Sequence, residues 1–146
     1  MSKKRTGQPW MPAAQYAATL RGLGVNLLVR DIALALPFQQ QVLAAHVVYQ
    51  DADFAAIEYG DAHWMLHAWH TYDSHPLHAQ LISATPRGIG AELRLYGRDP
   101  DLAEAAALAL GCVIAQSSAD KAHGLRECFI EDPDGYLWVP GIALRR

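Results

Sequence analysis

Histidine is the residue type in this sequence with the clearest chemical potential. The chain has seven histidines, and four of them fall in one short stretch: His67, His70, His75 and His78. Neutral imidazole is a common zinc ligand, but paired metal-binding residues follow short, recurring spacings. Here the spacings are three, five and three, across the end of an expected strand and a loop that contains Pro76. The pattern favours a polar loop at the rim of a site or at a subunit contact over a zinc cluster.

His67 and Glu92 are the two residues best placed to act on a bound molecule. An imidazole titrates near neutral pH, so His67 could serve as a hydrogen-bond partner or a general base. A structural histidine with satisfied hydrogen bonds is the alternative. Glu92 points toward the interior of a concave site if Leu93 and Leu95 face a helix, and into solvent if they do not. The sequence leaves both alternatives open.

Several aromatic residues lie near the expected strands, where their flat faces could stack on a planar or cationic ligand. They are Trp64, Trp69, Tyr72, Tyr136 and Trp138. Core packing is the commoner role of a strand tryptophan, so Trp69 and Tyr72, which are nearer to a loop, are the better candidates for ligand contacts. Arg126 and Glu127 either pair on a solvated face or meet a ligand, and pairing is the simpler interpretation.

Other kinds of reaction centre lack their sequence signatures. There is no recognisable Ser-His-Asp order, glycine-rich phosphate loop or CxxC pair, and Gly88-Ile-Gly90 lacks a third glycine and a preceding strand. Cys112 and Cys128 lie in apolar runs, which indicates buried free thiols. Nucleophilic catalysis and nucleotide binding are therefore unsupported.

The composition describes an ordinary globular protein. The chain has 146 residues, of which 51% are hydrophobic and 18% charged, and no apolar run approaches the roughly 20 residues of a membrane-spanning helix. The net charge of -3 and the scattered basic residues, clustered only at residues 3–5 and 145–146, make nucleic acid an unexpected partner. Residues 7–9 (GQP) stand where a secretory signal would have its apolar stretch. We therefore expect a soluble cytoplasmic protein.

The first half of the chain predicts a tail followed by one mixed module. Residues 1–22 are expected to form a tail with a short helix within 12–20. Apolar and alternating patterns then predict a strand, a helix and three strands, at 25–29, 32–44, 46–50, 54–59 and 63–69. Asp31 is the expected N-cap of the helix, and Pro37 is at odds with a regular helix.

The same order of signals returns after a connector at residues 70–90. It predicts a strand at 91–96, a helix at 102–110 capped by Asp99 to Asp101, and strands at 112–116, 125–130 and 136–142. Two such βαβββ modules, at about 23–80 and 88–144, predict an α+β fold. We expect one domain, residues 23–146, whose curved mixed sheets form a cup with helices outside.

The stretch from Gly124 to Trp138 (GLRECFIEDPDGYLW) resembles the signature hairpin of the vicinal-oxygen-chelate superfamily, which includes glyoxalases, bleomycin-resistance proteins and extradiol dioxygenases. Residues 25–31 (VNLLVRD) are similar to the start of the first family module, and residues 53–61 with Leu66-His67 are similar to the middle of bleomycin-resistance proteins. The resemblance covers residues 23–143. It implies paired modules, a cup-shaped site and commonly a dimer, with functions from metal-dependent isomerases, dioxygenases and thiol transferases to metal-free drug binding.

The resemblance also implies positions for metal ligands. They correspond to Gly24 (or to Asn26, if the register slips by two), His67, Glu92 and Val139. Gly24 and Val139 have no side-chain donor, and His67 with Glu92 falls short of the three protein ligands that a catalytic divalent site ordinarily has. We therefore expect neither a metal centre nor another cofactor.

These arguments predict a metal-independent protein that binds a small drug-like or aromatic molecule, with no catalytic residue assigned. The expected protein is a homodimer, and its cup is lined by His67, Trp69, Glu92 and Phe129. The alternative is a lyase or dioxygenase that depends on a divalent metal such as Zn, Mn, Fe or Ni, in which His63, His70 or a partner-chain residue joins His67 and Glu92. A structural or regulatory interaction module is a third hypothesis.

Overall fold

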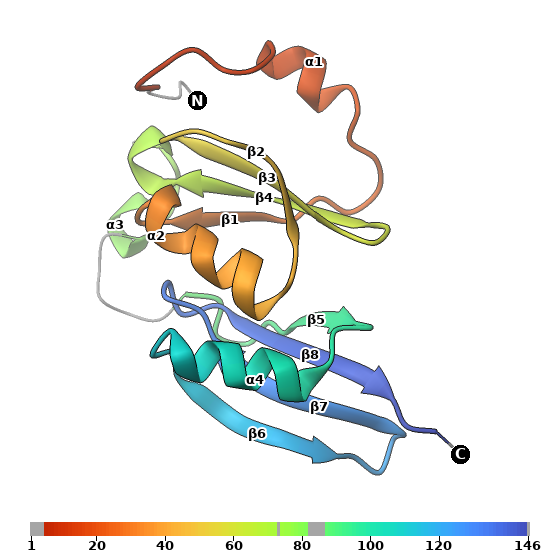
Figure 1. Cartoon of the computed structure of the whole chain (residues 1–146). Helices are drawn as coiled ribbons and strands as arrows, with labels where there is room; N and C mark the ends of the chain where they lie inside the picture. Colours follow the sequence, from red (N-terminus) through yellow and green to blue (C-terminus); the bar gives the residue numbers. More distant parts are fainter. Residues whose placement is uncertain (1–4, 73, 82–86, 146) are drawn as a thin grey trace. The chain divides into compact units, whose positions relative to one another are not determined.

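The computed structural model describes residues 5–72, 74–81 and 87–145. It divides the chain into two compact units. Unit 1 consists of Met1–Leu34 and His46–Ser83, and unit 2 consists of Ala35–Ala45 and Ala84–Arg146. Each unit has one four-stranded mixed sheet (Figure 1). The basic residues Lys3, Lys4 and Arg146 lie outside the described residues.

The sheet of unit 1 has the strand order β1-β4-β3-β2. Its strands are β1 (Asn26–Val29), β2 (His46–Gln50), β3 (Phe54–Tyr59) and β4 (Ala62–Ala68), with β1 parallel to β4 and the other pairs antiparallel. One face holds the buried core side chains Ala55, Ile57, Trp64, Leu66 and Ala68. Because successive side chains of a strand point to opposite faces, Phe54, Met65 and His67 lie on the other face.

That other face of the sheet is where the N-terminal part of the chain lies. Residues 5–20, which we call the N-terminal arm, run along the sheet and include α1 (Ala13–Ala17), the predicted short helix (Figure 1). After β4 the chain forms a 3-10 turn, η2 (Trp69–Tyr72), and a short helix, α3 (His78–Leu81). Neither η2 nor α3 was predicted, because each is about one turn long and leaves no periodic pattern.

The predicted helix at residues 32–44 is present but irregular. α2 (Ile32–Pro37) begins after Asp31, whose side chain accepts a hydrogen bond from the backbone N–H of Leu34 as expected (2.9 Å). It continues as a π-helical turn, η1 (Phe38–Val42), in which Leu43 N–H donates to the carbonyl of Phe38 (3.2 Å). Proline has no N–H to donate within a helix. The change to the wider π spacing begins directly after Pro37, where the sequence predicts an irregular helix.

The sheet of unit 2 has the order β5-β8-β7-β6. Its strands are β5 (Leu93–Tyr96), β6 (Ile114–Asp120), β7 (Leu125–Glu131) and β8 (Leu137–Ala143). The helix α4 (Pro100–Ala109) packs against β6, β7, β8 and η1 and buries Ala103 and Ala107. Its predicted cap is confirmed: the side chain of Asp99 accepts hydrogen bonds from the backbone N–H groups of Asp101 and Leu102.

The turn between β7 and β8 is built around one buried carboxylate. Asp132 accepts hydrogen bonds from the backbone N–H groups of Asp134 (2.9 Å) and Tyr136 (3.0 Å), and from the indole N–H of Trp138 (3.0 Å). Gly135 supplies the positive φ of 87° that the turn requires. The predicted Asp-Pro-Asp-Gly turn is thus fixed by its own first side chain.

The predicted α+β class with two βαβββ modules is confirmed, and the sheets are curved and open. The largest strand shifts are in unit 2: β5 begins at Leu93, which leaves Glu92 before the strand, and β6 begins at Ile114 and extends to Asp120. Both cysteines are free; Cys128 is buried as expected, whereas Cys112 is half-buried. No helix in the described ranges is long and apolar enough to cross a membrane.

Candidate functional site

Unit 1 contains a pocket of about 330 Å³ between the N-terminal arm and the uncovered face of the sheet. The sheet side and η2 contribute Asn26, Phe54, Met65, His67 and Tyr72. The arm contributes Arg5, Pro9, Trp10, Met11, Ala13, Tyr16, Ala17 and Leu20. The lining is therefore largely aromatic and aliphatic, with a small polar group on the sheet side.

That polar group consists of Asn26, His67 and Tyr72. Asn26 Oδ1 lies 2.6 Å from His67 Nδ1, and Asn26 Nδ2 donates to the Tyr72 hydroxyl over 3.4 Å. An amide oxygen only accepts, so Nδ1 of His67 carries the proton of this bond and Nε2 is the basic nitrogen of the neutral ring. The His67 side chain is buried, at 7% exposure. The group is thus a pre-oriented hydrogen-bonding cluster.

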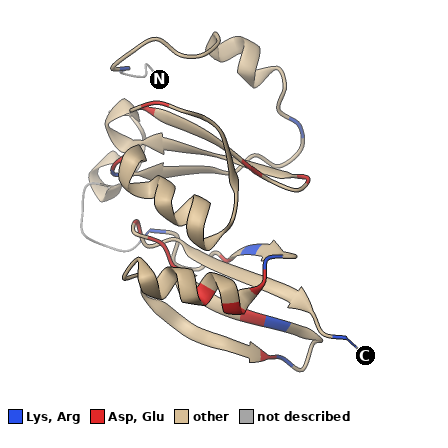
Figure 2. Ribbon diagram, in the orientation of Figure 1, with Lys and Arg blue, Asp and Glu red and all other residues tan. Residues whose placement is uncertain are grey.

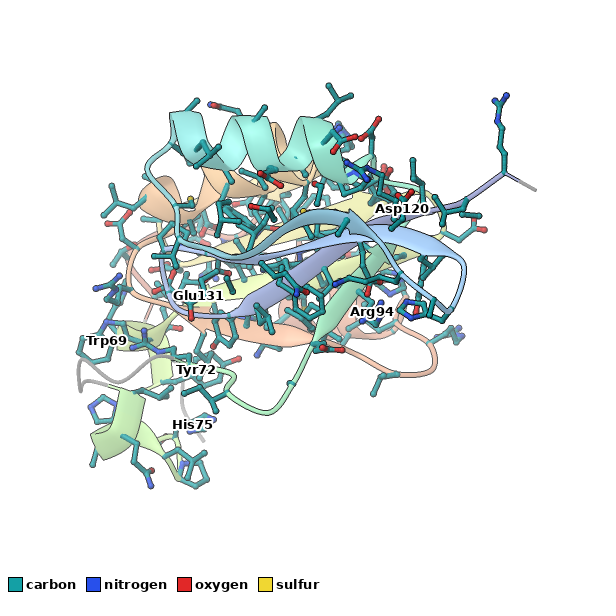
Figure 3. The ribbon with its side chains drawn as sticks, turned by 90° about the horizontal axis from the view of Figure 1, so that it is seen from below. Trp69, Tyr72, His75, Arg94, Asp120 and Glu131 are labelled. Carbon is teal, nitrogen blue, oxygen red and sulfur yellow. The ribbon has the colours of Figure 1, made fainter. Side chains whose placement is uncertain are left out.

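Aromatic rings hold the imidazole of His67 in place. The ring centroid of Phe54 lies 4.8 Å from that of His67, and Tyr72 meets it edge-on at 5.1 Å. His75 in turn lies edge-on to Tyr72 at 6.0 Å, beside η2 (Figure 3). Tilted and edge-on pairs of this kind are favourable ring contacts. The position of His67 is therefore set by packing as well as by its hydrogen bond.

The first residues of the arm are fixed to the loop between β2 and β3. Thr6 donates two hydrogen bonds to the carboxylate of Asp53, one from its backbone N–H (2.8 Å) and one from its hydroxyl (2.9 Å). Arg5 makes an ion pair with Asp51 (2.6 Å), and Nε2 of His70 lies 3.1 Å from Asp53. The Asp53 side chain is almost fully buried, at 1% exposure.

The two carboxylates remain charged at neutral pH. Burial by itself would raise the pKa of Asp53, but hydrogen bonds from Thr6 and His70 and the charge of Arg5 outweigh it and hold the pKa below its usual value. The pKa of Asp51 is likewise lowered, because hydrogen bonds from Tyr49, Asp53 and Arg5 outweigh the effect of burial. The attachment of the arm is therefore a set of charge-assisted bonds.

Further along, the arm touches the sheet through aromatic rings. Trp10 stacks on Tyr49 with ring centroids 4.7 Å apart and planes only 9° from parallel. Tyr16 on α1 meets Phe54 edge-on at 5.4 Å. Unit 1 has few charged residues around its sheet, whereas charged residues gather around α4, β5 and β7 in unit 2 (Figure 2). The pocket lining of unit 1 is mostly aromatic and aliphatic, and Arg5 is its charged residue.

Only some of the predicted site residues line the pocket of unit 1. His67 lines the pocket of unit 1, and so does Tyr72. Trp69 does not line it; its ring packs against the ring of His78 at a tilt of 50°, with centroids 5.4 Å apart. Trp64 and Trp138 are buried core residues, as the simpler interpretation held. Ligand contacts by Trp69 stay a prediction that this pocket does not support.

Glu92 and Phe129 belong to unit 2. Glu92 is exposed and pairs with Arg94 (3.0 Å), a residue of β5 (Figure 3). Arg94 also forms a close ion pair with Glu127, whose other oxygen lies 3.3 Å from His123 Nε2. The amino group of Lys121 lies 5.9 Å from the ring centroid of Phe129. Ligand contacts by Glu92 and Phe129 remain predictions.

Arg126 and Glu127 pair with residues on different sides of β7. Arg126 makes ion pairs with the exposed Asp101 (3.0 Å) and Asp120 (2.9 Å), in agreement with pairing on a solvated face. For Glu127 that interpretation is wrong, because its side chain is buried and pairs with Arg94. Arg126 does not pair with Glu127, because successive strand residues point to opposite faces.

The donor set does not fit the metal centre of the superfamily. Among residues 5–72, 74–81 and 87–145, no three His, Cys, Asp or Glu side chains are grouped so that they could hold a metal ion. Asn26, and not Gly24, lies beside His67; Gly24 is exposed, with open space around it. Val139 is a buried residue of β8 without a donor atom. The four histidines after His67 contact other residues: His70 contacts Asp53, His75 contacts Tyr72, His78 contacts Trp69 and His123 contacts Glu127.

Sequence reasoning missed the half of the pocket that the arm supplies. Trp10, Tyr16 and Thr6 were assigned to a tail and a short helix, and nothing in their spacing indicates partners on β2 and β3. The one feature of the sequence that could have pointed to the arm is its composition, because two aromatic residues and a methionine stand among small residues.

Comparison with solved structures identifies the fold. A structure of a glyoxalase/bleomycin resistance protein/dioxygenase family enzyme from Burkholderia phytofirmans PsJN matches with a TM-score of 0.67 at 20% identity, over 82% of this chain and 96% of that one. A glyoxalase-related enzyme from Fulvimarina pelagi matches with a TM-score of 0.65 at 15% identity, over 84% and 88%. A glyoxalase/bleomycin resistance protein/dioxygenase from Nocardioides gives 0.60 at 17%, over 90% and 93%.

These matches confirm the resemblance to the vicinal-oxygen-chelate superfamily at the level of the fold. No family model matches the sequence, and no curated protein matches it. Because one fold supports many chemistries, the function has to be argued from the residues of the site.

Proposed function

We propose that this protein binds a small, flat and largely apolar molecule, without a metal ion, in the pocket of unit 1. The single observation that carries the proposal is the pocket itself: about 330 Å³, walled by aromatic and aliphatic side chains, with His67 and its partners as the polar group. Small-molecule sites commonly combine an apolar lining of this size with a few placed polar atoms.

The walls account for affinity and the polar group for orientation. An aromatic ring of the ligand placed among Trp10, Tyr16 and Phe54 would be removed from water. It would make stacked or edge-on contacts with the rings of these side chains. The Asn26-His67-Tyr72 group combines hydrogen-bond donors and acceptors. Arg5, the one cation of the lining, is already paired with Asp51. The pocket therefore suits a neutral aromatic molecule with a hydrogen-bonding substituent.

The test is a fluorescence titration with prodan, a neutral naphthalene ketone whose emission shifts to the blue in apolar surroundings. We expect saturable binding that EDTA does not change. Met65→Trp, which fills the pocket from β4, should weaken binding roughly tenfold or more, since the added ring occupies the ligand volume. Leu77→Trp, at an exposed position of unit 1 outside the pocket, should leave binding unchanged.

Two results would overturn the proposal. One is the absence of saturable binding by prodan and by a panel of other neutral bicyclic aromatic compounds. The other is binding that Met65→Trp does not weaken, which would place the ligand elsewhere. Loss of binding in EDTA, restored by one divalent metal, would favour the metal-dependent alternative. We also propose that the protein is a homodimer. Size-exclusion chromatography with light scattering tests this independently.

A further inference from the structure

The N-terminal arm has little structure of its own. α1 has only five residues, its N-cap Pro12 makes no side-chain capping bond, and none of its residues is buried. Residues 5–10 are exposed as well. A helix this short is marginal in isolation, so the contacts with the sheet hold the arm in place. Segments with few buried contacts open at a small fraction of the free energy of global unfolding.

Those contacts are concentrated at a few places. At the start of the arm, Thr6 holds the buried carboxylate of Asp53 by two hydrogen bonds. In its middle, Trp10 stacks on Tyr49, and on α1 Tyr16 meets Phe54. Pro9, Trp10, Met11, Ala13 and Ala17 lie between or beside these attachments and face the pocket. A ligand under this span would touch the sheet on one side and the arm on the other.

We propose that the N-terminal arm is a strap over the pocket, which opens to admit the ligand and closes on it, with the Thr6–Asp53 contact as its latch. This inference rests on the proposed binding function, and it describes what controls the entry and release of the ligand. The pocket space that remains under the arm in the closed position distinguishes a strap from a plug, because a plug would fill the site that it blocks.

The latch predicts kinetic behaviour. If opening precedes entry, the observed binding rate of prodan should approach a plateau as its concentration rises, since the opening step becomes limiting. Removing one latch bond should raise that plateau and the rate of prodan release. A bound ring that touches the arm should also slow opening, so ligand and latch protect the same backbone amides from hydrogen exchange.

The experiment uses the full-length protein with Thr6→Val, Trp10→Ala and the control Gln8→Ala, an exposed arm residue that does not line the pocket. In Thr6→Val we expect prodan release to accelerate roughly tenfold, the cost of one bond to a buried carboxylate. Trp10→Ala should weaken prodan affinity roughly tenfold through the lost ring contacts. Gln8→Ala should match the wild type. Saturating prodan should slow exchange across residues 5–20.

The outcomes separate this inference from the proposed function. If prodan binding is sensitive to Met65→Trp but unaffected by Thr6→Val and Trp10→Ala, the strap is wrong and the binding function stands. Tighter binding in Thr6→Val would mean that the arm is an inhibitory plug, which also overturns the strap. If no ligand binds, exchange still tests the latch: amides of residues 5–10 should exchange faster in Thr6→Val than in Gln8→Ala, and equal rates would refute it.

Discussion

Asn26 and His67 lie on adjacent parallel strands, and their side chains are joined by a 2.6 Å hydrogen bond across the floor of the pocket. The resemblance to the vicinal-oxygen-chelate superfamily implies metal-ligand positions on these two strands. Here one position carries an amide whose oxygen accepts the histidine proton. The pair therefore fixes the imidazole tautomer, a role that a neighbouring carbonyl or carboxylate commonly has for histidine.

Asn26→Asp should raise the pKa of His67 relative to the wild type by about one unit or more, because a carboxylate at hydrogen-bond distance stabilises the imidazolium. An NMR titration of the histidine ring protons measures this shift. The control is Gln15→Glu, which adds a carboxylate to α1 at an exposed position outside the pocket lining. A His67 titration that does not respond to Asn26→Asp would contradict the hydrogen bond.

Arg94→Met should destabilise the protein by about 3 kcal/mol, because it removes the guanidinium that pairs with the buried carboxylate of Glu127. Urea unfolding measures the change. Arg126→Met is the matched control: its partners are exposed carboxylates, so the loss should stay below about 1 kcal/mol. Glu127→Gln added to Arg94→Met should restore part of the stability, and a further loss would refute the argument.

The regular elements were predictable because their signals are local. The alternating strands and the Asp99 cap of α4 need only neighbours in the chain, and the sequence predicted them to within a few residues. The helix from Ile32 was predicted too, but its change to π spacing after Pro37 was not. A missing N–H signals that a helix will be irregular without specifying how.

The pocket was predictable only in part, because its walls come from distant segments. His67 was identified through the resemblance, and Asn26 entered only as an alternative register to Gly24. The arm contacts are long-range: Thr6 meets Asp53 and Trp10 meets Tyr49 with some forty residues between them. Such contacts leave no periodic pattern, because a single attachment needs only one residue at each end.

Gly88→Ala should cost more stability than Gly90→Ala, although both glycines have positive φ, at 72° and 92°. Either alanine must adopt a backbone conformation that non-glycine residues disfavour, which lowers stability by about 1 kcal/mol or somewhat more. At Gly88 the new Cβ would also lie 2.7 Å from Cδ1 of Tyr136, whereas at Gly90 it meets open space. Thermal unfolding of the two variants checks the difference, and equal losses would show that the Tyr136 ring moves freely.

Asp132→Asn should abolish one component of the pH dependence of stability. Burial raises the pKa of Asp132 from an ordinary value of 3.8 to about 6, although three hydrogen bonds oppose the shift. The folded protein therefore binds this proton more tightly than the unfolded chain does. The resulting stabilisation is fully present below pH 3.8 and is lost as the pH rises through about 6, an effect of about 3 kcal/mol.

The measurement is the free energy of unfolding in urea from pH 4 to pH 8, for the wild type, Asp132→Asn and the exposed control Asp61→Asn. Asp132→Asn should be less stable than the wild type at pH 4, because an amide NH₂ would then face one of the three donors. The wild-type advantage should shrink as the pH rises to 7, whereas Asp61→Asn should run parallel to the wild type. A wild-type advantage that grows with pH would mean that the hydrogen bonds to the carboxylate outweigh its burial.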